Sequence, residues 1–189
     1  VGLLRQHLHP GQQIHGIVGY GGAAPNIVPG HTVLLYYLRA TSAELLDDLG
    51  RRAEGCFAAG ALATGCTHRI RTVSPPYTEL TPDPWLVQAY REEVIGLGRA
   101  PLPAEEEGLR PLGSTDMGNV TNVVPGIHPV IGLDSGGAVT HQEAFAAACV
   151  PDSADREVLD GARALAATAA RAAADAVQRA RLPEGVARR

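Results

Sequence analysis

The sequence predicts an α/β fold that is built from two parts. Three observations predict it. Residues 1–77 contain apolar strand patterns and one long helix pattern, and residues 78–189 have helical periodicity over much of their length. The sequence Ser74-Pro75-Pro76, near the end of the first part, interrupts regular structure between the two. The first part has the order helix end, strand, strand, helix, strand, which is most of a split βαβ, or ferredoxin-like, unit. We therefore expect two domains, residues 1–77 and residues 78–189.

The elements expected in the first domain follow one another closely. In chain order they are a helix end over residues 1–9, strands over 12–19 and 31–39, a helix from Thr41 or Ser42 to Gly65, and a third strand over 66–73. The expected helix has apolar residues at helical spacing, which predict its buried face. These residues are Leu45, Leu49, Ala53, Cys56, Phe57 and Ala61.

The second domain is expected to be mainly helical. Its elements are a helix from Asp83 to about Gly98, a connector over 99–111, strand candidates at 120–124 and 128–133, a short helix over 141–149, and a long alanine-rich helix over 152–182. The predicted buried face of the long helix contains Val158, Ala162, Leu165, Ala169, Ala173 and Val177.

Composition excludes several functional classes. The 189 residues are 45% apolar and 19% charged, which argues against disorder. The net charge of −4 argues against nucleic-acid binding, and no apolar run approaches the length of a membrane span. All 16 basic residues are arginine, so Schiff-base chemistry and a phosphate-binding lysine are excluded. Three widely spaced cysteines fit no disulfide framework, and we expect a cytoplasmic location.

Two candidate sites lie in the first domain. Asn26 follows a glycine-rich turn and lies between two prolines. Because proline restricts the backbone, this pattern favours a preformed binding loop. His15 lies on the strand that precedes this loop. A plain hairpin turn, with Asn26 bonded to its own backbone, is the alternative. Arg39 ends the second strand, where it can pair with a substrate carboxylate or form an ordinary surface salt bridge.

The second domain carries two more candidates. Ser114, Thr115 and Asp116 lie between glycines, which permit close approach of a ligand, although an ordinary helix cap would use the same residues. His141 precedes a short predicted helix and can act either as a metal ligand or as a surface residue. His128 has the same ambiguity, and a structural role is favoured for it.

Taken together, these clusters resemble the M20 metallopeptidase and amidohydrolase family, and most closely its subgroup of dipeptidases and aminobenzoyl-glutamate hydrolase B subunits. The resemblance covers most of the chain from Leu3 to Ala148. The matching stretches, in chain order, are HGIVGYGGAAPNIVP, YYLRA, AEGCFAAGALATGC, GSTDMGNVTNVVPGIHP and THQEAF.

The resemblance implies an architecture and a chemistry. Residues 1–77 would be part of a lid that also forms a homodimer contact, and residues 78–189 would be the C-terminal part of a mixed-sheet catalytic domain. Two divalent ions, usually zinc, would activate water for attack on an amide bond of a small dipeptide or N-acyl amino acid. The resemblance implies that His141 is a metal ligand, since it matches the family's last metal-binding histidine. The substrate-binding positions are Asn26, Arg39, Ser114, Thr115 and Asp116, with His15 as a feature of the subgroup.

The resemblance is incomplete in one respect. The family's His-x-Asp ligand pair, bridging aspartate and catalytic Glu-Glu pair lie ahead of the matching motifs, so no residue of this sequence matches them. A catalytic zinc needs about three protein ligands, and one candidate is found. We therefore expect a C-terminal piece of a longer hydrolase that is inactive by itself and is completed by an N-terminal half. The alternative is a non-catalytic dimerisation fragment.

Overall fold

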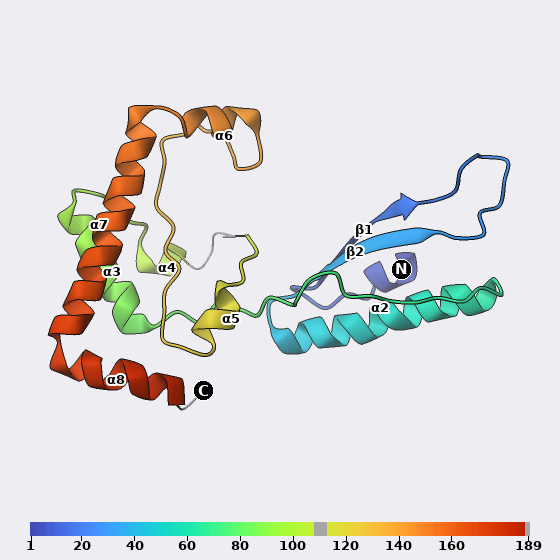
Figure 1. The fold of residues 1–189 in the computed structure, drawn as a ribbon, viewed down its shortest axis with the longest axis horizontal. Helices are drawn as coiled ribbons and strands as arrows, with labels where there is room; N and C mark the ends of the chain where they lie inside the picture. Colours follow the sequence, from blue (N-terminus) through green and yellow to red (C-terminus); the bar gives the residue numbers. More distant parts are fainter. Residues whose placement is uncertain (108–112, 188–189) are drawn as a thin grey trace. The chain divides into compact units, whose positions relative to one another are not determined.

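A computed structural model describes residues 1–107 and 113–187 (Figure 1). The chain divides into two compact units, Val1–Glu79 (unit 1) and Leu80–Arg189 (unit 2). Helices are combined with a small antiparallel sheet, which agrees with the predicted α/β class. The roles of lid and catalytic domain stay predictions.

Unit 1 contains a hairpin and a long helix. Its elements are α1 (Gly2–Arg5), β1 (Gln13–Tyr20), β2 (Val33–Arg39) and α2 (Ala43–Ala63). The two strands are antiparallel, with Ile14 opposite Leu38, and their register is irregular between Val18 and Tyr20. The first two predicted strands and the helix that follows them are therefore confirmed.

The core of unit 1 lies between α2 and one face of the hairpin. Leu4, Ile14, Leu49 and Ala53 form its buried cluster, as the helical spacing in α2 predicts. Tyr36 packs against Phe57 with ring centroids 5.1 Å apart. A glycine at position 16 makes room for this tyrosine, because a Cβ atom there would lie 2.3 Å from the ring.

Local signals fix both ends of α2. The Ser42 hydroxyl accepts a hydrogen bond from the Leu45 amide at 3.3 Å, and this caps the first turn. Gly65 has a φ of +66°, and the Cys66 amide donates to the Ala61 carbonyl at 2.9 Å, which closes the last turn. The predicted limits of this helix are confirmed.

The predicted third strand over 66–73 is wrong, because these residues form no strand. A strand exists only where a neighbour completes its hydrogen-bond ladder. In a split βαβ unit, another strand lies between the two strands that a helix connects. Among the described residues the sheet contains only β1 and β2, so the neighbour that residues 66–73 would need is not there.

Unit 2 is helical. Its elements are α3 (Pro84–Gly96), α4 (Ala104–Glu107), α5 (Met117–Thr121), α6 (Glu143–Ala148), α7 (Asp152–Ala174) and α8 (Ala176–Ala187).

The helices predicted near 84–98 and 141–149 are confirmed, and part of the connector, 108–111, lies outside the described residues. Both strand candidates are wrong, since α5 includes Val120 and residues 122–133 form no strand. Short apolar runs do not distinguish a strand from irregular packed chain.

The long C-terminal helix is interrupted at Asp175, whose ψ is 116°. Its carboxylate accepts hydrogen bonds from the amides of Val177 at 2.8 Å and Gln178 at 3.2 Å, and so caps α8. Arg179 donates to the carbonyls of Ala173 and Ala174, at the end of α7. The prediction of one continuous helix is therefore wrong.

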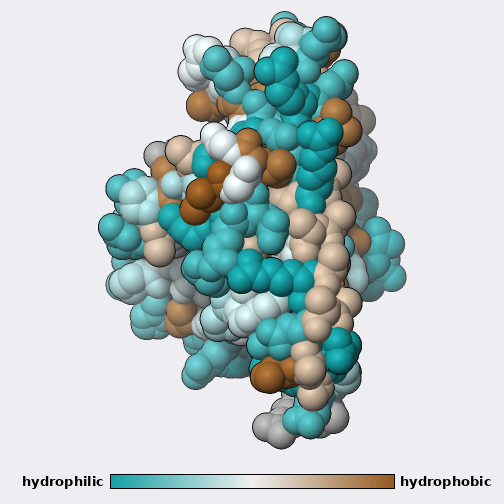
Figure 2. All heavy atoms as spheres, turned by 90° about the vertical axis from the view of Figure 1, so that its left-hand side faces the viewer, coloured by the Kyte–Doolittle hydropathy of each residue, from teal (hydrophilic) through white to brown (hydrophobic). Residues whose placement is uncertain are grey.

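The buried face of α7 also differs from the prediction. Small residues pack inward (Ala154, Ala164, Thr168 and Ala172), whereas Val158 is 69% exposed and Leu165 is 45% exposed. Small side chains let α7 approach α3 closely, and the larger apolar residues face outward. Figure 2 shows a band of weakly hydrophobic residues along this side of unit 2, among hydrophilic neighbours.

Asp83 connects α3 with α8. Its carboxylate caps α3 by accepting from the amides of Trp85 and Leu86, both at 3.1 Å. The same carboxylate accepts two hydrogen bonds from Arg181, at 2.7 and 3.0 Å. The Arg181 hydrogen bond in particular lowers the pKa of Asp83 below its ordinary value.

Among the described residues, no helix is both long enough and apolar enough to span a membrane.

Candidate functional site

Asn26 lies in the connection between β1 and β2, at one end of the hairpin (Figure 1). The Ile27 amide donates to the Ala24 carbonyl at 3.2 Å, which closes a turn around Pro25 and Asn26. The Asn26 side chain is exposed, and it has no hydrogen-bond partner among the described residues. A bond from Asn26 to its own backbone is therefore not found, and its amide is free to contact a ligand.

Arg39 lies at the opposite end of the hairpin, where it pairs in the ladder with Gln13. Its side chain is exposed and forms no ion pair within the described part of the chain. Seven strand residues separate the two ends by roughly 20 Å, so Asn26 and Arg39 do not form one site within unit 1. His15 lies between them, opposite Tyr37, with its Nε2 atom 3.3 Å from the Gln13 side-chain oxygen.

The turn at Ser114–Asp116 is a second group of accessible polar residues. Gly113 enters it with a φ of +81°, a conformation that favours glycine. Ser114 and Asp116 are exposed, and neither side chain has a partner among the described residues. Asp116 begins α5 without bonding to its first-turn amides. Its carboxylate is therefore available to a cationic ligand.

Thr115 joins this turn to a residue that the sequence did not assign to it. Its hydroxyl oxygen lies 3.3 Å from Nδ1 of His128, and it accepts a hydrogen bond from the Met117 amide at 3.2 Å. Thr115 is half-buried. Both residues are candidates in the sequence analysis, but their contact could not be predicted there. They lie 13 positions apart, and no helix or strand period relates such positions in irregular chain.

His141 is exposed and has a φ of +68°, which is uncommon for a residue other than glycine. It lies just before α6, and α6 lies away from α5 in Figure 1. Among the described residues, no hydrogen bond or ion pair joins His141 to the Ser114–Asp116 turn. No group of three His, Cys, Asp or Glu side chains that could hold a metal ion occurs in residues 1–107 and 113–187. These residues by themselves do not fit a zinc centre.

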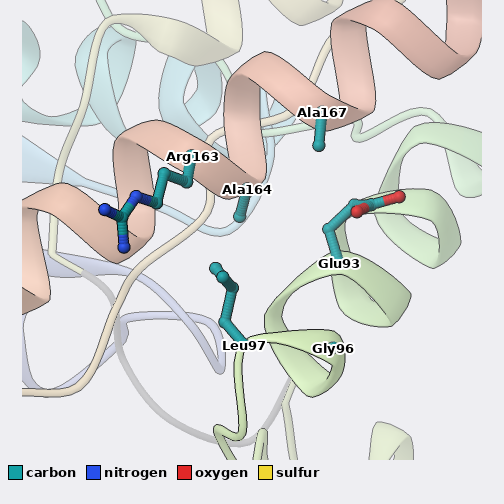
Figure 3. A pocket seen from close by; sticks show the side chains of 6 residues that line it. All are labelled: Glu93, Gly96, Leu97, Arg163, Ala164 and Ala167. Atoms are coloured by element: carbon teal, nitrogen blue, oxygen red, sulfur yellow. The ribbon is translucent and has the colours of Figure 1, made fainter.

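A shallow hollow of about 250 Å³ lies between α3 and α7 (Figure 3). The charged residues that line it are Glu93 and Arg163. It is smaller than a typical ligand pocket and contains none of the predicted site residues. It is therefore not the candidate site.

Comparison with known proteins identifies relatives. No family model matches the chain. The chain is 43% identical over 169 residues to a Xaa-Arg dipeptidase of Mus musculus and 41% identical over 167 residues to a Xaa-Arg dipeptidase of Homo sapiens. Each match covers 88% of this chain and 38% of the relative, so the chain spans about two fifths of their length. Together with its motifs, this similarity shows that the chain belongs to the M20 peptidase family.

Proposed function

We propose that this chain is part of a dipeptidase that hydrolyses dipeptides with a C-terminal arginine. The observation that carries the proposal is the identity of 41–43% to Xaa-Arg dipeptidases over 88% of the chain. The names of these relatives favour dipeptides over N-acyl amino acids as the substrate class.

The accessible polar residues give this proposal a chemical basis. A dipeptide that ends in arginine carries a carboxylate, an amide and a guanidinium group. Within unit 1, Arg39 can pair with the carboxylate or Asn26 can hydrogen-bond to the amide, but one dipeptide does not reach both, because they lie at opposite ends of the hairpin. In unit 2, the Asp116 carboxylate has the charge that a guanidinium requires. We assign Ser114 and Thr115, together with Asp116, to a substrate-binding turn of unit 2. We also assign His15 of unit 1 to substrate binding; its Nε2 atom lies 3.3 Å from the Gln13 side-chain oxygen.

We propose zinc as the cofactor and His141 as the one ligand that this chain contributes. The other ligands would come from outside the described residues, so no reaction step is derived through the metal. We also propose that unit 1 is part of a ferredoxin-like lid and that it supports a homodimer. The exposed side chains of Ile17 and Tyr37, which are 65% and 58% accessible on the hairpin, support this assignment.

A chimera tests the proposed function. In the human relative, this chain would replace the 167 residues that it matches. We expect the chimera to hydrolyse Ala-Arg and to leave N-acetylglutamate intact, because the relatives act on Xaa-Arg dipeptides. The release of free arginine measures the rate.

The matched control is the human relative with the same segment deleted, and we expect it to be inactive. A chimera that shows cooperative unfolding but releases no arginine would show that the proposed function is wrong. Cleavage of N-acetylglutamate in preference to Ala-Arg would overturn the substrate class.

A further inference from the structure

We propose that His128 is a positioning residue that holds the Ser114–Asp116 turn in the conformation that binds substrate. This inference rests on the proposed function, in which the turn contacts the dipeptide. It concerns a residue for which the sequence favoured only a structural role.

The hydroxyl group of Thr115 connects the imidazole to the turn. A threonine hydroxyl has one hydrogen to donate and two lone pairs to accept with. The Met117 amide can only donate, so the Thr115 oxygen accepts from it at 3.2 Å. We assign the hydroxyl hydrogen of Thr115 to Nδ1 of His128, which lies 3.3 Å from the same oxygen. This arrangement uses a neutral imidazole with its proton on Nε2.

His128 lies on a segment that is fixed on both sides of it. The Asp83 amide donates to the Gly126 carbonyl at 2.9 Å. On the other side, the Arg99 guanidinium donates to the Gly132 carbonyl at 2.6 Å. Asp83 is 3% exposed, so the first of these anchors is buried. The imidazole therefore extends from a held backbone and can act as a support.

The two sides of the turn are held in different ways. Beyond the turn, α5 is anchored through the fully buried Thr121, whose hydroxyl oxygen accepts from the Thr81 amide at 3.0 Å. The Asn122 side chain adds a bond to the Gly118 carbonyl at 2.9 Å. The entry side of the turn is residues 114–116, ahead of α5. There, the Thr115–His128 bond is the one side-chain hydrogen bond that joins the turn to a distant segment within the described residues.

Loss of the imidazole should therefore loosen the entry side and leave α5 in place. Ser114 and Asp116 would sample more conformations, and the substrate would have to order them on binding. Because one hydrogen bond contributes about 1 kcal/mol, we expect KM for Ala-Arg to rise about fivefold. The value of kcat should change little, since His128 is not placed at the reacting bond.

Two measurements test this inference, one on the isolated chain and one on the chimera. In the isotope-labelled full chain, nuclear magnetic resonance gives the tautomer of His128 and the hydrogen-exchange rate of the Met117 amide. In the chimera, KM and kcat for Ala-Arg are compared between wild type, His128→Ala and His128→Asn. The asparagine oxygen can accept from Thr115 in place of Nδ1, so this variant should restore most of the lost affinity. Val130→Ala is the matched control, because Val130 lies on the same segment and is 67% exposed.

We expect the Nε2–H tautomer, faster exchange at Met117 in His128→Ala, and a raised KM that His128→Asn largely reverses. If the wild-type chimera cleaves Ala-Arg and His128→Ala leaves KM unchanged, the inference alone is wrong. If KM rises equally in His128→Ala and Val130→Ala, the effect belongs to the segment and the inference is again wrong. If the folded wild-type chimera does not cleave Ala-Arg, the proposed function fails, and the role of His128 in substrate binding fails with it.

Discussion

Replacement of Asp83 by alanine should destabilise unit 2 by about 3 kcal/mol, because one carboxylate both caps α3 and binds Arg181. The alanine variant would leave the first-turn amides of α3 and the guanidinium without this acceptor. Arg181 is 41% exposed, so water compensates part of the loss on its side. The chain has a single tryptophan, Trp85, in the first turn of α3, and its fluorescence during urea unfolding reports this transition.

Asp83→Asn separates the two roles of the carboxylate. Its side-chain oxygen can still cap α3, but the charge that pairs with Arg181 is lost, so we expect about half of the destabilisation. Equal unfolding midpoints for wild type and Asp83→Ala would contradict the assignment.

Acid should remove the same contribution. The pKa of Asp83 is lowered in the folded chain, first by the Arg181 hydrogen bond, so the unfolded state binds the proton at a higher pH than the folded state does. The stabilisation is complete above the ordinary value of 3.8 and is lost as the pH falls through the lower folded value. In Asp83→Asn this part of the pH dependence should be absent.

Leu49→Ala should destabilise unit 1 by about 3 kcal/mol, because Leu49 is fully buried at the centre of a small cluster. Few other buried side chains can compensate for the cavity. Cys56 is half-buried against this cluster, whereas Cys66 and Cys149 are exposed. Thiol labelling should therefore show two fast groups and one slow group, and the slow phase should accelerate about 100-fold in the variant.

Leu62→Ala is the matched control, since Leu62 lies on the same helix and is 83% exposed. It should change the slow phase by less than about threefold, because exposed substitutions cost little. Similar acceleration in both variants would show that Leu49 is not the centre of this core.

The parts of the fold that local chemistry determines could be predicted from the sequence. Ser42, the apolar spacing through Leu49 and Ala53, and Gly65 determine α2 without reference to distant residues. Residues 66–73 could not be predicted in this way, because a strand depends on a neighbour that the described sheet does not contain.

Helix α7 shows a second reason for failure. The sequence analysis placed the larger apolar side chains on the buried face of α7. In the structure Ala164 and Thr168 are buried instead, because small side chains allow α7 to pack closely against α3. A local signal for the break at Asp175 was present, since Asp175 is followed three positions later by Gln178 and has the pattern of a helix N-cap.

The residues of the candidate site could be predicted from the sequence, but their arrangement could not. Motifs identified Asn26, Arg39, Asp116 and His141 one by one, but not their arrangement in space. The structure places Asn26 and Arg39 at opposite ends of one hairpin. It also joins Thr115 to His128 through a contact that has no sequence period.

The most direct test of the central claim is the rate of Ala-Arg hydrolysis by the chimera after His141→Ala. If this chain supplies a metal ligand to a dipeptidase, the rate and the bound zinc should both fall, the rate by at least about 100-fold. His31→Ala, which removes an exposed histidine outside the predicted site, should leave both unchanged. A His141→Ala chimera that keeps its full rate and its zinc would contradict the account and would favour a non-catalytic role for this chain.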